Sequence, residues 1–352
     1  MNLKIAAAVA VLQVLVLGYM AGQREWIMRT GTPLTLRTAP VDPTDPMRGA
    51  YVRLNYEIST VPAALCQEET AQWLAVTDYR QQRRLRDRVV YAVLKTNAHG
   101  QAELVALQEM PPPEGPYLRG RVVSIDANGI RVRYGIEALF MAREAAIRTE
   151  GQALTEKAGA PMAVSVAVGR DGTAVLKDYA WEPLGLTITL HRPPETEPRD
   201  PNRPWMQAQR PINAFTATLH NYSDRDLAIV DLPRGRSFRL VPNRLMNADR
   251  YTWAPPHDMG APTPESPHII VLKPGATHAI QIDLTQPEWW VLDTAQPDAQ
   301  PVSLAEIRDW TASFRLEYDP PAAETVRGLP HADLIRHVPL PSRAFSPMQG
   351  ID

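Results

Sequence analysis

Three carboxylates bracket a short segment of the chain that could carry chemistry. Asp42 precedes the stretch DPMRGAYVRLNYEIS, Asp45 opens it, and Glu57 lies near its end. Grouped carboxylates can bind a hard cation or divide general acid and general base roles. A pocket joining them with Arg48 or Arg53 would suit a hydrolase or a ligand-binding enzyme. Because Asp-Pro pairs are also common turn formers, a purely structural turn stays open as the alternative.

The other reactive residue types form no recognised constellation. The eight histidines show no HxH or HExxH spacing, and His268 and His278 are expected on successive strands. Cys66 is the sole cysteine, which excludes an intrachain disulfide and a Cys-rich zinc site, and we expect it within a helix as a small apolar residue. We therefore predict no cofactor, no metal and no catalytic residue. The balance favours a protein that is not an enzyme.

The block from Gly49 to Tyr56 reads as a turn that enters a strand. Gly49 suits a turn that needs a positive φ or a close backbone approach. Side chains alternate along a strand, so one face carries the apolar set Ala50, Val52, Leu54, Tyr56 and Ile58. Tyr51 points to the opposite, polar face. This pattern predicts a scaffold element with Leu54 and Tyr56 in the core.

An apolar run near the amino terminus predicts a membrane segment. Residues 5–22 are interrupted only by Gln13, and 18 residues are near the lower limit for a spanning helix. A cleaved signal peptide is the competing interpretation of residues 1–24, but the run is long for a signal core. We expect a single-pass anchor in a bacterial inner membrane, with the bulk of the chain on the periplasmic side.

Residues 25–190 predict a β-rich α+β domain. The expected strands are RVVYAVLKT, AELVALQEM, YLRGRVVSI, IRVRYGI, PMAVSVAVG and TAVLKDY. Helical spacing of apolar residues predicts one helix over residues 61–86, whose end carries a dense arginine cluster. A second helical piece is expected over residues 138–157. Arg170, Asp171 and Gly172 are typical of a hairpin turn.

The carboxyl-terminal half predicts a second, separate β domain. Residues 191–211 are rich in proline and charge, which favours an extended linker. Residues 212–352 contain short strands at regular intervals with Gly and Pro turns, the pattern of an antiparallel, Ig-like β-sandwich. The fold class is therefore mainly β with minor α.

Bulk composition bounds the classes of function. The net charge of −2 leaves no excess of cations to release counterions from a polyanion, which argues against nucleic-acid binding. At 44% hydrophobic residues the chain can bury a sizeable core. The 34 prolines favour strands joined by rigid turns.

The stretch PVDPTDPMRGAYVRLNYEIS resembles the bacterial GDYXXLXY family. The matching motif positions are Gly49, Ala50, Tyr51, Leu54 and Tyr56, and the resemblance continues through VVYAVLK, PYLRGRV, YGIEALF and AVSVAVGRDGTAVLK, over residues 30–180. Ala50 replaces the family aspartate, and the aromatic-Pro-Glu-Gly expected after YGIE is absent. The resemblance implies a membrane-anchored bacterial protein of unassigned biochemical role. The loss of the aspartate favours a structural over a catalytic motif.

Three functions follow as hypotheses. The first is a non-catalytic scaffold that binds another envelope or membrane protein. The second is an envelope hydrolase or ligand-binding enzyme built on Asp42, Asp45 and Glu57. The third is a sandwich that binds carbohydrate or peptide through exposed indoles, with Trp205, Trp289 and Trp290 as candidates.

Overall fold

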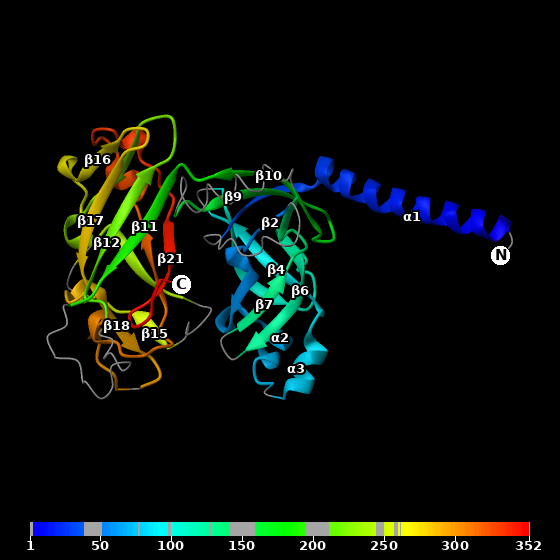
Figure 1. Cartoon of the computed structure of the whole chain (residues 1–352), viewed down its shortest axis with the longest axis horizontal. Helices are drawn as coiled ribbons and strands as arrows, with labels where there is room; N and C mark the ends of the chain where they lie inside the picture. Colours follow the sequence, from blue (N-terminus) through cyan, green and yellow to red (C-terminus); the bar gives the residue numbers. More distant parts are fainter. Residues whose placement is uncertain are drawn as a thin grey trace, which may run out of the picture. The chain divides into compact units, whose positions relative to one another are not determined.

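The chain forms two compact units that are both mainly β (Figure 1). The computed structural model describes residues 3–38, 51–76, 78–97, 100–126, 129–140, 159–193, 211–243, 250–256, 260, 262–296 and 298–351. Unit 1 comprises Met1–Ala39, Gly49–Ala142 and Met162–Ala180, and unit 2 comprises Pro40–Arg48, Arg143–Pro161 and Trp181–Asp352. The sheets are antiparallel, as the sequence predicts.

Helix α1 (Leu3–Thr30) joins the first strand of unit 1 without a linker. Its described side chains are exposed apart from Ile27, which is buried. The N–H of Gly31 donates to the carbonyl of Ile27 at 2.8 Å. A Cβ on Gly31 would lie 2.6 Å from that carbonyl oxygen and 3.0 Å from the backbone of Val168, so only glycine allows this joint. Within the part of the chain that the structure describes, no helix has both the length and the apolar character needed to cross a membrane.

Three sheets build the body of unit 1. Strands β1 (Thr32–Arg37), β9 (Met162–Val168) and β10 (Ala174–Trp181) form the first, in that order. Strands β2 (Tyr51–Arg53) and β8 (Ala138–Phe140) form the second. The five-stranded sheet has the order β3 (Thr60–Pro62), β7 (Gly129–Arg133), β6 (Tyr117–Asp126), β4 (Val89–Thr96) and β5 (Ala102–Gln108). The strands predicted between residues 88 and 180 are thus confirmed.

The helix predicted over residues 61–86 is wrong. In its place lie strand β3, a 3-10 turn (Ala63–Leu65) and two short helices, α2 (Glu68–Trp73) and α3 (Tyr79–Leu85). Val61 pairs with Ile130 of β7, so a sheet partner outweighs the local helical spacing. Cys66 lies just after the 3-10 turn and not within a helix. It is buried, and burial raises the pKa of its thiol to about 11, so the thiolate that a nucleophile requires is suppressed.

Other calls fall outside the described residues. They are most of the linker predicted over residues 191–211 and most of the helical piece predicted over residues 138–157. At the described edges both predictions are wrong, because His191 ends the strand Leu184–His191 and residues 138–140 form β8. The hairpin at residues 170–172 is confirmed: Gly169 donates to the carbonyl of Thr173 at 2.9 Å, and Gly172 adopts a φ of +78°.

Unit 2 packs four antiparallel sheets around one main apolar core. The two larger sheets are β11 (Leu184–His191), β12 (Ala214–Asn221) and β17 (Thr277–Asp283), and β14 (Phe238–Pro242), β20 (Phe314–Tyr318), β21 (Leu340–Ser346) and β22 (Gly350–Ile351). The smaller two are β13 (Leu227–Val230) with β16 (Ile269–Leu272), and β15 (Tyr251–Trp253), β18 (Trp290–Asp293) and β19 (Val302–Ser303). Both larger sheets contribute buried side chains to the same core, and Phe215 meets Phe345 there with ring centroids 5.8 Å apart.

Strand β11 belongs to unit 2, so the boundary between the units differs from the predicted one. The sequence places residues 184–190 at the end of the first domain, yet β11 pairs along its length with β12, from Leu184 opposite Asn221 to His191 opposite Ala214. The longest segment of the second unit therefore starts at Trp181. Elsewhere in unit 2, Arg250 directly precedes β15 and forms two ion pairs, with Asp293 at 3.0 Å and with Asp309 at 2.6 Å. The hydrogen bonds of its guanidinium lower the pKa of Asp293.

A glycine in β6 makes room for an aromatic side chain of unit 1. Tyr134 follows β7 and is buried, and its ring lies over Gly120. A Cβ on Gly120 would lie 2.3 Å from Cγ1 of Val132 and 3.0 Å from Cδ1 of Tyr134. Real Cβ atoms do not approach other atoms that closely, so the seat of Tyr134 depends on the absence of a side chain at this position.

We expect Gly120→Ala to destabilise unit 1 by about 1–3 kcal/mol, because the added methyl group displaces Val132 and the Tyr134 ring. Hydrogen–deuterium exchange of the β6 and β7 peptides in the full chain measures the effect locally. Val123→Ala is the matched control, since Val123 lies in the same strand and is 41% exposed. Equal protection in Gly120→Ala and in the wild type would contradict this packing.

Candidate functional site

The family motif lies in a segment that turns from a strand into a 3-10 helix. Strand β2 ends at Arg53, and the 3-10 helix η1 covers Glu57–Ser59. Leu54 and Tyr56 are each 1% exposed, while Glu57 is exposed. The predicted alternation is therefore confirmed for the described side chains, although the strand itself is shorter than expected. The motif places two large side chains in the core of unit 1.

The motif segment faces the segment YGIE, which lies about 80 residues further along the chain. Strand β2 pairs with β8, from Tyr51 opposite Phe140 to Arg53 opposite Ala138. The pairing continues beyond the strand, because the N–H of Leu54 donates to the carbonyl of Glu137 at 2.8 Å. Two pieces of sequence that both carry the family resemblance are thus in direct backbone contact.

Each of these two segments contributes a tyrosine whose hydroxyl binds a backbone carbonyl of the other segment. The hydroxyl of Tyr56 donates to the carbonyl of Ile136 at 2.8 Å, and the hydroxyl of Tyr134 donates to the carbonyl of Ile58 at 2.8 Å. Both hydroxyls are buried, so each bond also satisfies a carbonyl that water does not reach. We call this arrangement, made of Tyr56, Ile58, Tyr134 and Ile136, the tyrosine exchange. It fixes the position of one segment against the other.

The carboxylate of Glu137 holds the turn next to Tyr134 and thereby supports the tyrosine exchange. Its carboxylate accepts hydrogen bonds from the N–H groups of Tyr134 and Gly135, the second at 2.9 Å, and thereby closes a turn in which Gly135 has a φ of +80°. Burial, reinforced by this carboxylate, raises the pKa of both Tyr56 and Tyr134 well above the usual 10. Both hydroxyls consequently stay protonated and act as hydrogen-bond donors and not as bases.

A second junction joins the segment PYLRGRV to the hairpin turn. The Tyr117 hydroxyl donates to the carbonyl of Arg170 at 2.6 Å, and the N–H of Arg119 donates to the carbonyl of Gly172 at 2.8 Å. A Cβ on Gly172 would lie 2.6 Å from the ring of Tyr117. Because Gly120 of the same strand seats Tyr134, β6 connects this junction with the tyrosine exchange.

The predicted acidic cluster is described at only one of its three positions. Asp42, Asp45 and Arg48 lie outside the described residues, as do the motif positions Gly49 and Ala50. Glu57 is exposed on η1. Of Tyr51 and Arg53 only the backbone is described. Among the described residues, no group of His, Cys, Asp or Glu could hold a metal ion. The cluster stays a prediction.

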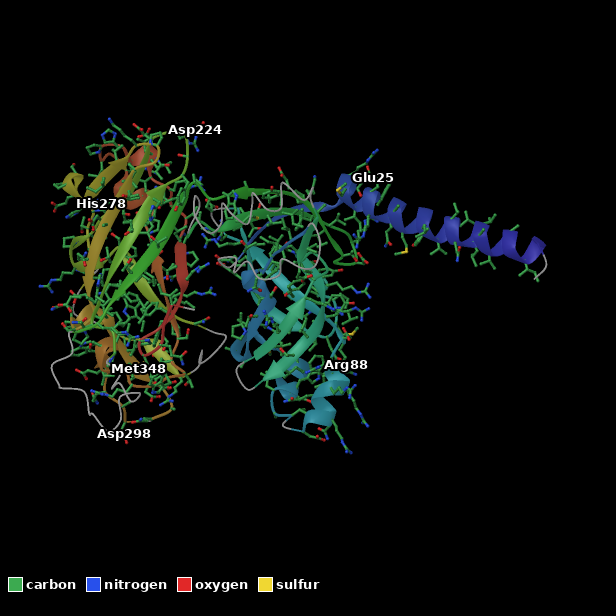
Figure 2. All side chains as sticks on the ribbon, viewed as in Figure 1. Glu25, Arg88, Asp224, His278, Asp298 and Met348 are labelled. Atoms are coloured by element: carbon green, nitrogen blue, oxygen red, sulfur yellow. The ribbon has the colours of Figure 1, made fainter. Side chains whose placement is uncertain are left out.

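The two histidines singled out in unit 2 have different side-chain partners. Nδ1 of His268 accepts from the N–H of Glu265 at 3.1 Å, whereas Nε2 of His278 lies 2.8 Å from Oδ2 of Asp231. The prediction of successive strands is wrong for His268, which ends the 3-10 helix Ser266–His268. His278 lies in β17, and Asp231 follows β13; both side chains are partly exposed. Figure 2 labels His278.

The expectation that Trp289 is an exposed indole is wrong. It is 1% exposed and packs edge-on against Phe215, with ring centroids 5.9 Å apart. Trp290 is partly exposed, and Trp205 lies outside the described residues. Trp289 therefore packs in the core of unit 2 and does not line a binding surface.

Sequence reasoning missed Tyr134, Glu137 and Gly120 as parts of the motif site. The available signal was the alternation of Val132, Tyr134 and Ile136, all three of them buried, which repeats the pattern of Leu54 and Tyr56. What the sequence did not contain was the pairing of two segments so far apart.

Comparison with known proteins gives one positive result. A family model described as GDYXXLXY protein matches residues 13–178. The match confirms the resemblance predicted over residues 30–180 and extends it into α1. No curated protein and no solved structure matches the chain.

We expect Tyr56→Phe and Tyr134→Phe each to lower the stability of unit 1 by about 1–2 kcal/mol, because each leaves a buried carbonyl without its donor. Hydrogen–deuterium exchange of the peptides that contain residues 54–60 and 134–138 reports the loss in the full chain. Tyr91→Phe is the control, since the Tyr91 hydroxyl has no hydrogen bond to any described residue. If both variants kept wild-type protection but lost a binding activity, the motif would be a ligand site and not a structural junction.

Proposed function

We propose that the protein, whose residues 13–178 belong to the GDYXXLXY family, is a membrane-anchored envelope protein that binds and positions another envelope or membrane protein without catalysing a reaction. The proposed location is a bacterial inner membrane, with residues 5–22 as a single-pass anchor. Both β units would then lie on the periplasmic side.

The observation that carries the proposal is the exposed apolar surface of α1. Val11, Leu12, Val14, Leu15 and Leu17 are each between 59% and 68% exposed. These positions spread around more than half of the circumference of the helix, so packing against one side of the helix could not cover them all. Side chains of this kind are stable in a lipid environment and costly in water. The surface therefore supports a membrane as the surroundings of α1.

A second observation supports the role of a scaffold. The described motif side chains, Leu54 and Tyr56, are occupied in core packing and in the tyrosine exchange. The same holds for Tyr117, Tyr134 and the glycines that seat them. The family signature, where it is described, thus specifies a rigid body attached to the carboxyl-terminal end of α1. A rigid body on an anchor suits a protein that presents a binding surface at a membrane.

We expect the wild-type chain to sediment with membranes and to resist extraction at alkaline pH. Leu12→Arg combined with Val16→Arg should release it, because an arginine near the centre of a spanning helix costs about 2.5–3.5 kcal/mol. Trp26→Arg is the matched control, since Trp26 is also exposed on α1 but lies beyond residue 22. Extraction of the wild-type chain, or equal behaviour of the double variant, would argue against the anchor.

We also expect the tagged full chain, purified from gently solubilised membranes, to carry a partner protein in fixed stoichiometry. Size-exclusion chromatography with light scattering measures the protein mass within the detergent complex. A mass equal to the 39.2 kDa of a single chain would contradict the proposed partner-binding role.

A further inference from the structure

Exposed arginines occupy neighbouring strands on the outer face of the five-stranded sheet. They are Arg119 and Arg121 on β6 and Arg131 and Arg133 on β7. Arg121 and Arg133 lie directly opposite each other in the register of the two strands. Like charges at directly opposed positions destabilise a sheet. Asp87 contacts both arginines and offsets part of this repulsion.

Helix α3 and the turn after it extend this surface. They contribute Arg80, Arg83, Arg84, Arg86 and Arg88, all of them exposed. The turn is attached to β6, because the N–H of Asp87 donates to the carbonyl of Val122 at 2.9 Å and the carbonyl of Arg88 accepts from the N–H of Val122 at 3.0 Å. Figure 2 shows Arg88 next to α3. We call the nine arginines of β6, β7, α3 and its turn the arginine face.

Carboxylates of unit 1 neutralise part of the arginine face. Asp87 binds Arg133 at 2.6 Å, and its carbonyl also accepts from Arg121 at 2.8 Å. Glu109 binds Arg88 at 2.8 Å, and a carboxylate oxygen of Asp171 lies 3.8 Å from Arg119. Within the described part of the chain, six members form no ion pair: Arg80, Arg83, Arg84, Arg86, Arg121 and Arg131. Positive charge therefore remains at both the α3 end and the β7 side of the face.

The overall net charge of −2 is the sum of a positive unit 1 and a negative unit 2. Unit 1 contains 17 Lys and Arg against 13 Asp and Glu, a net charge of +4, whereas unit 2 contains 20 against 26, a net charge of −6. The argument from composition against a general polyanion binder thus holds for the chain as a whole. It does not describe the face of unit 1, where the cations are concentrated.

We propose that the arginine face binds an acidic polypeptide segment of the partner protein. This inference rests on the proposed function and names the surface and the chemical class that would carry it. The guanidinium fork matches the geometry of a carboxylate, and the arginines of the face that form no ion pair within the described part of the chain could accept carboxylates of a partner.

Exposed apolar side chains beside the arginine face favour a protein partner over a lipid surface or a nucleic acid. Val123 follows Arg121 in β6 and is 41% exposed, and Met110 follows Glu109 and is 71% exposed. Arginine combined with methionine and other apolar contacts is typical of protein interfaces. An acidic segment with apolar residues between its carboxylates would meet both kinds of contact.

The test measures binding of fluorescent poly-L-glutamate to the full chain in neutral detergent at low salt. We expect binding that weakens as salt is raised, and at least about a tenfold loss of affinity in Arg83→Glu combined with Arg84→Glu. Arg225→Glu combined with Arg327→Glu is the matched control, because these exposed arginines of unit 2 give the same change in net charge. Circular dichroism establishes that both double variants are folded.

Several outcomes would overturn the inference. Failure of the wild-type chain to bind poly-L-glutamate, or an equal loss in both double variants, would remove the arginine face as a specific site. Binding to vesicles of anionic phospholipid or to single-stranded DNA in preference to poly-L-glutamate would assign the face to another class of ligand. If the R83E/R84E variant still purified with a full complement of partner, the proposed function would stand and only the assignment of its surface would fall.

Discussion

The fold of unit 1 depends on one constraint, which is that two distant segments must satisfy each other's buried polar groups. Tyr56 and Tyr134 each place a hydroxyl on a carbonyl of the opposite segment, and Leu54 adds a backbone hydrogen bond to Glu137. These groups are shielded from water, so separating the segments would leave donors and acceptors unpaired at a cost of roughly 1–3 kcal/mol each. The two segments also connect different sheets: β2 and β8 precede and follow the tyrosine exchange, and β3 pairs with β7 beside it. The described residues of the family motif therefore stabilise the contact between the sheets of unit 1.

Local patterns in the sequence predicted side-chain direction well and partners poorly. The alternation of Leu54, Tyr56 and Ile58 is enough to predict that they are buried, because direction is a property of the local backbone. The helix predicted over residues 61–86 failed because the same apolar spacing is compatible with short elements, and the pairing of Val61 with Ile130 decided between them. The seat of Tyr134 over Gly120 could not be predicted either, since glycine in a strand usually indicates only a weak position. No local pattern in the sequence around Gly120 predicts that the Tyr134 ring packs against it.

The same distinction explains the arginine face and the tryptophans of unit 2. The cluster from Arg80 to Arg88 is visible in the sequence, where a solvated helix end accounts for it. Only the attachment of its turn to Val122 brings it to the arginines of β6 and β7. Conversely, the sequence placed Trp289 and Trp290 side by side as equivalent indoles. The 3-10 helix that ends at Trp289 turns that indole into the core against Phe215 and leaves Trp290 partly exposed.

The joint at Gly31 has a mechanical consequence. Helix α1 passes into β1 through a single residue that is hydrogen-bonded to Ile27 and confined by the backbone of Val168. Ile27 also lies against Gly169, where a Cβ would come within 3.2 Å of its side chain. This connection is a single residue, and the backbone around it leaves no space for a side chain. Changing the direction of α1 at this joint would therefore require Gly31 to lose its contacts with Ile27 and Val168.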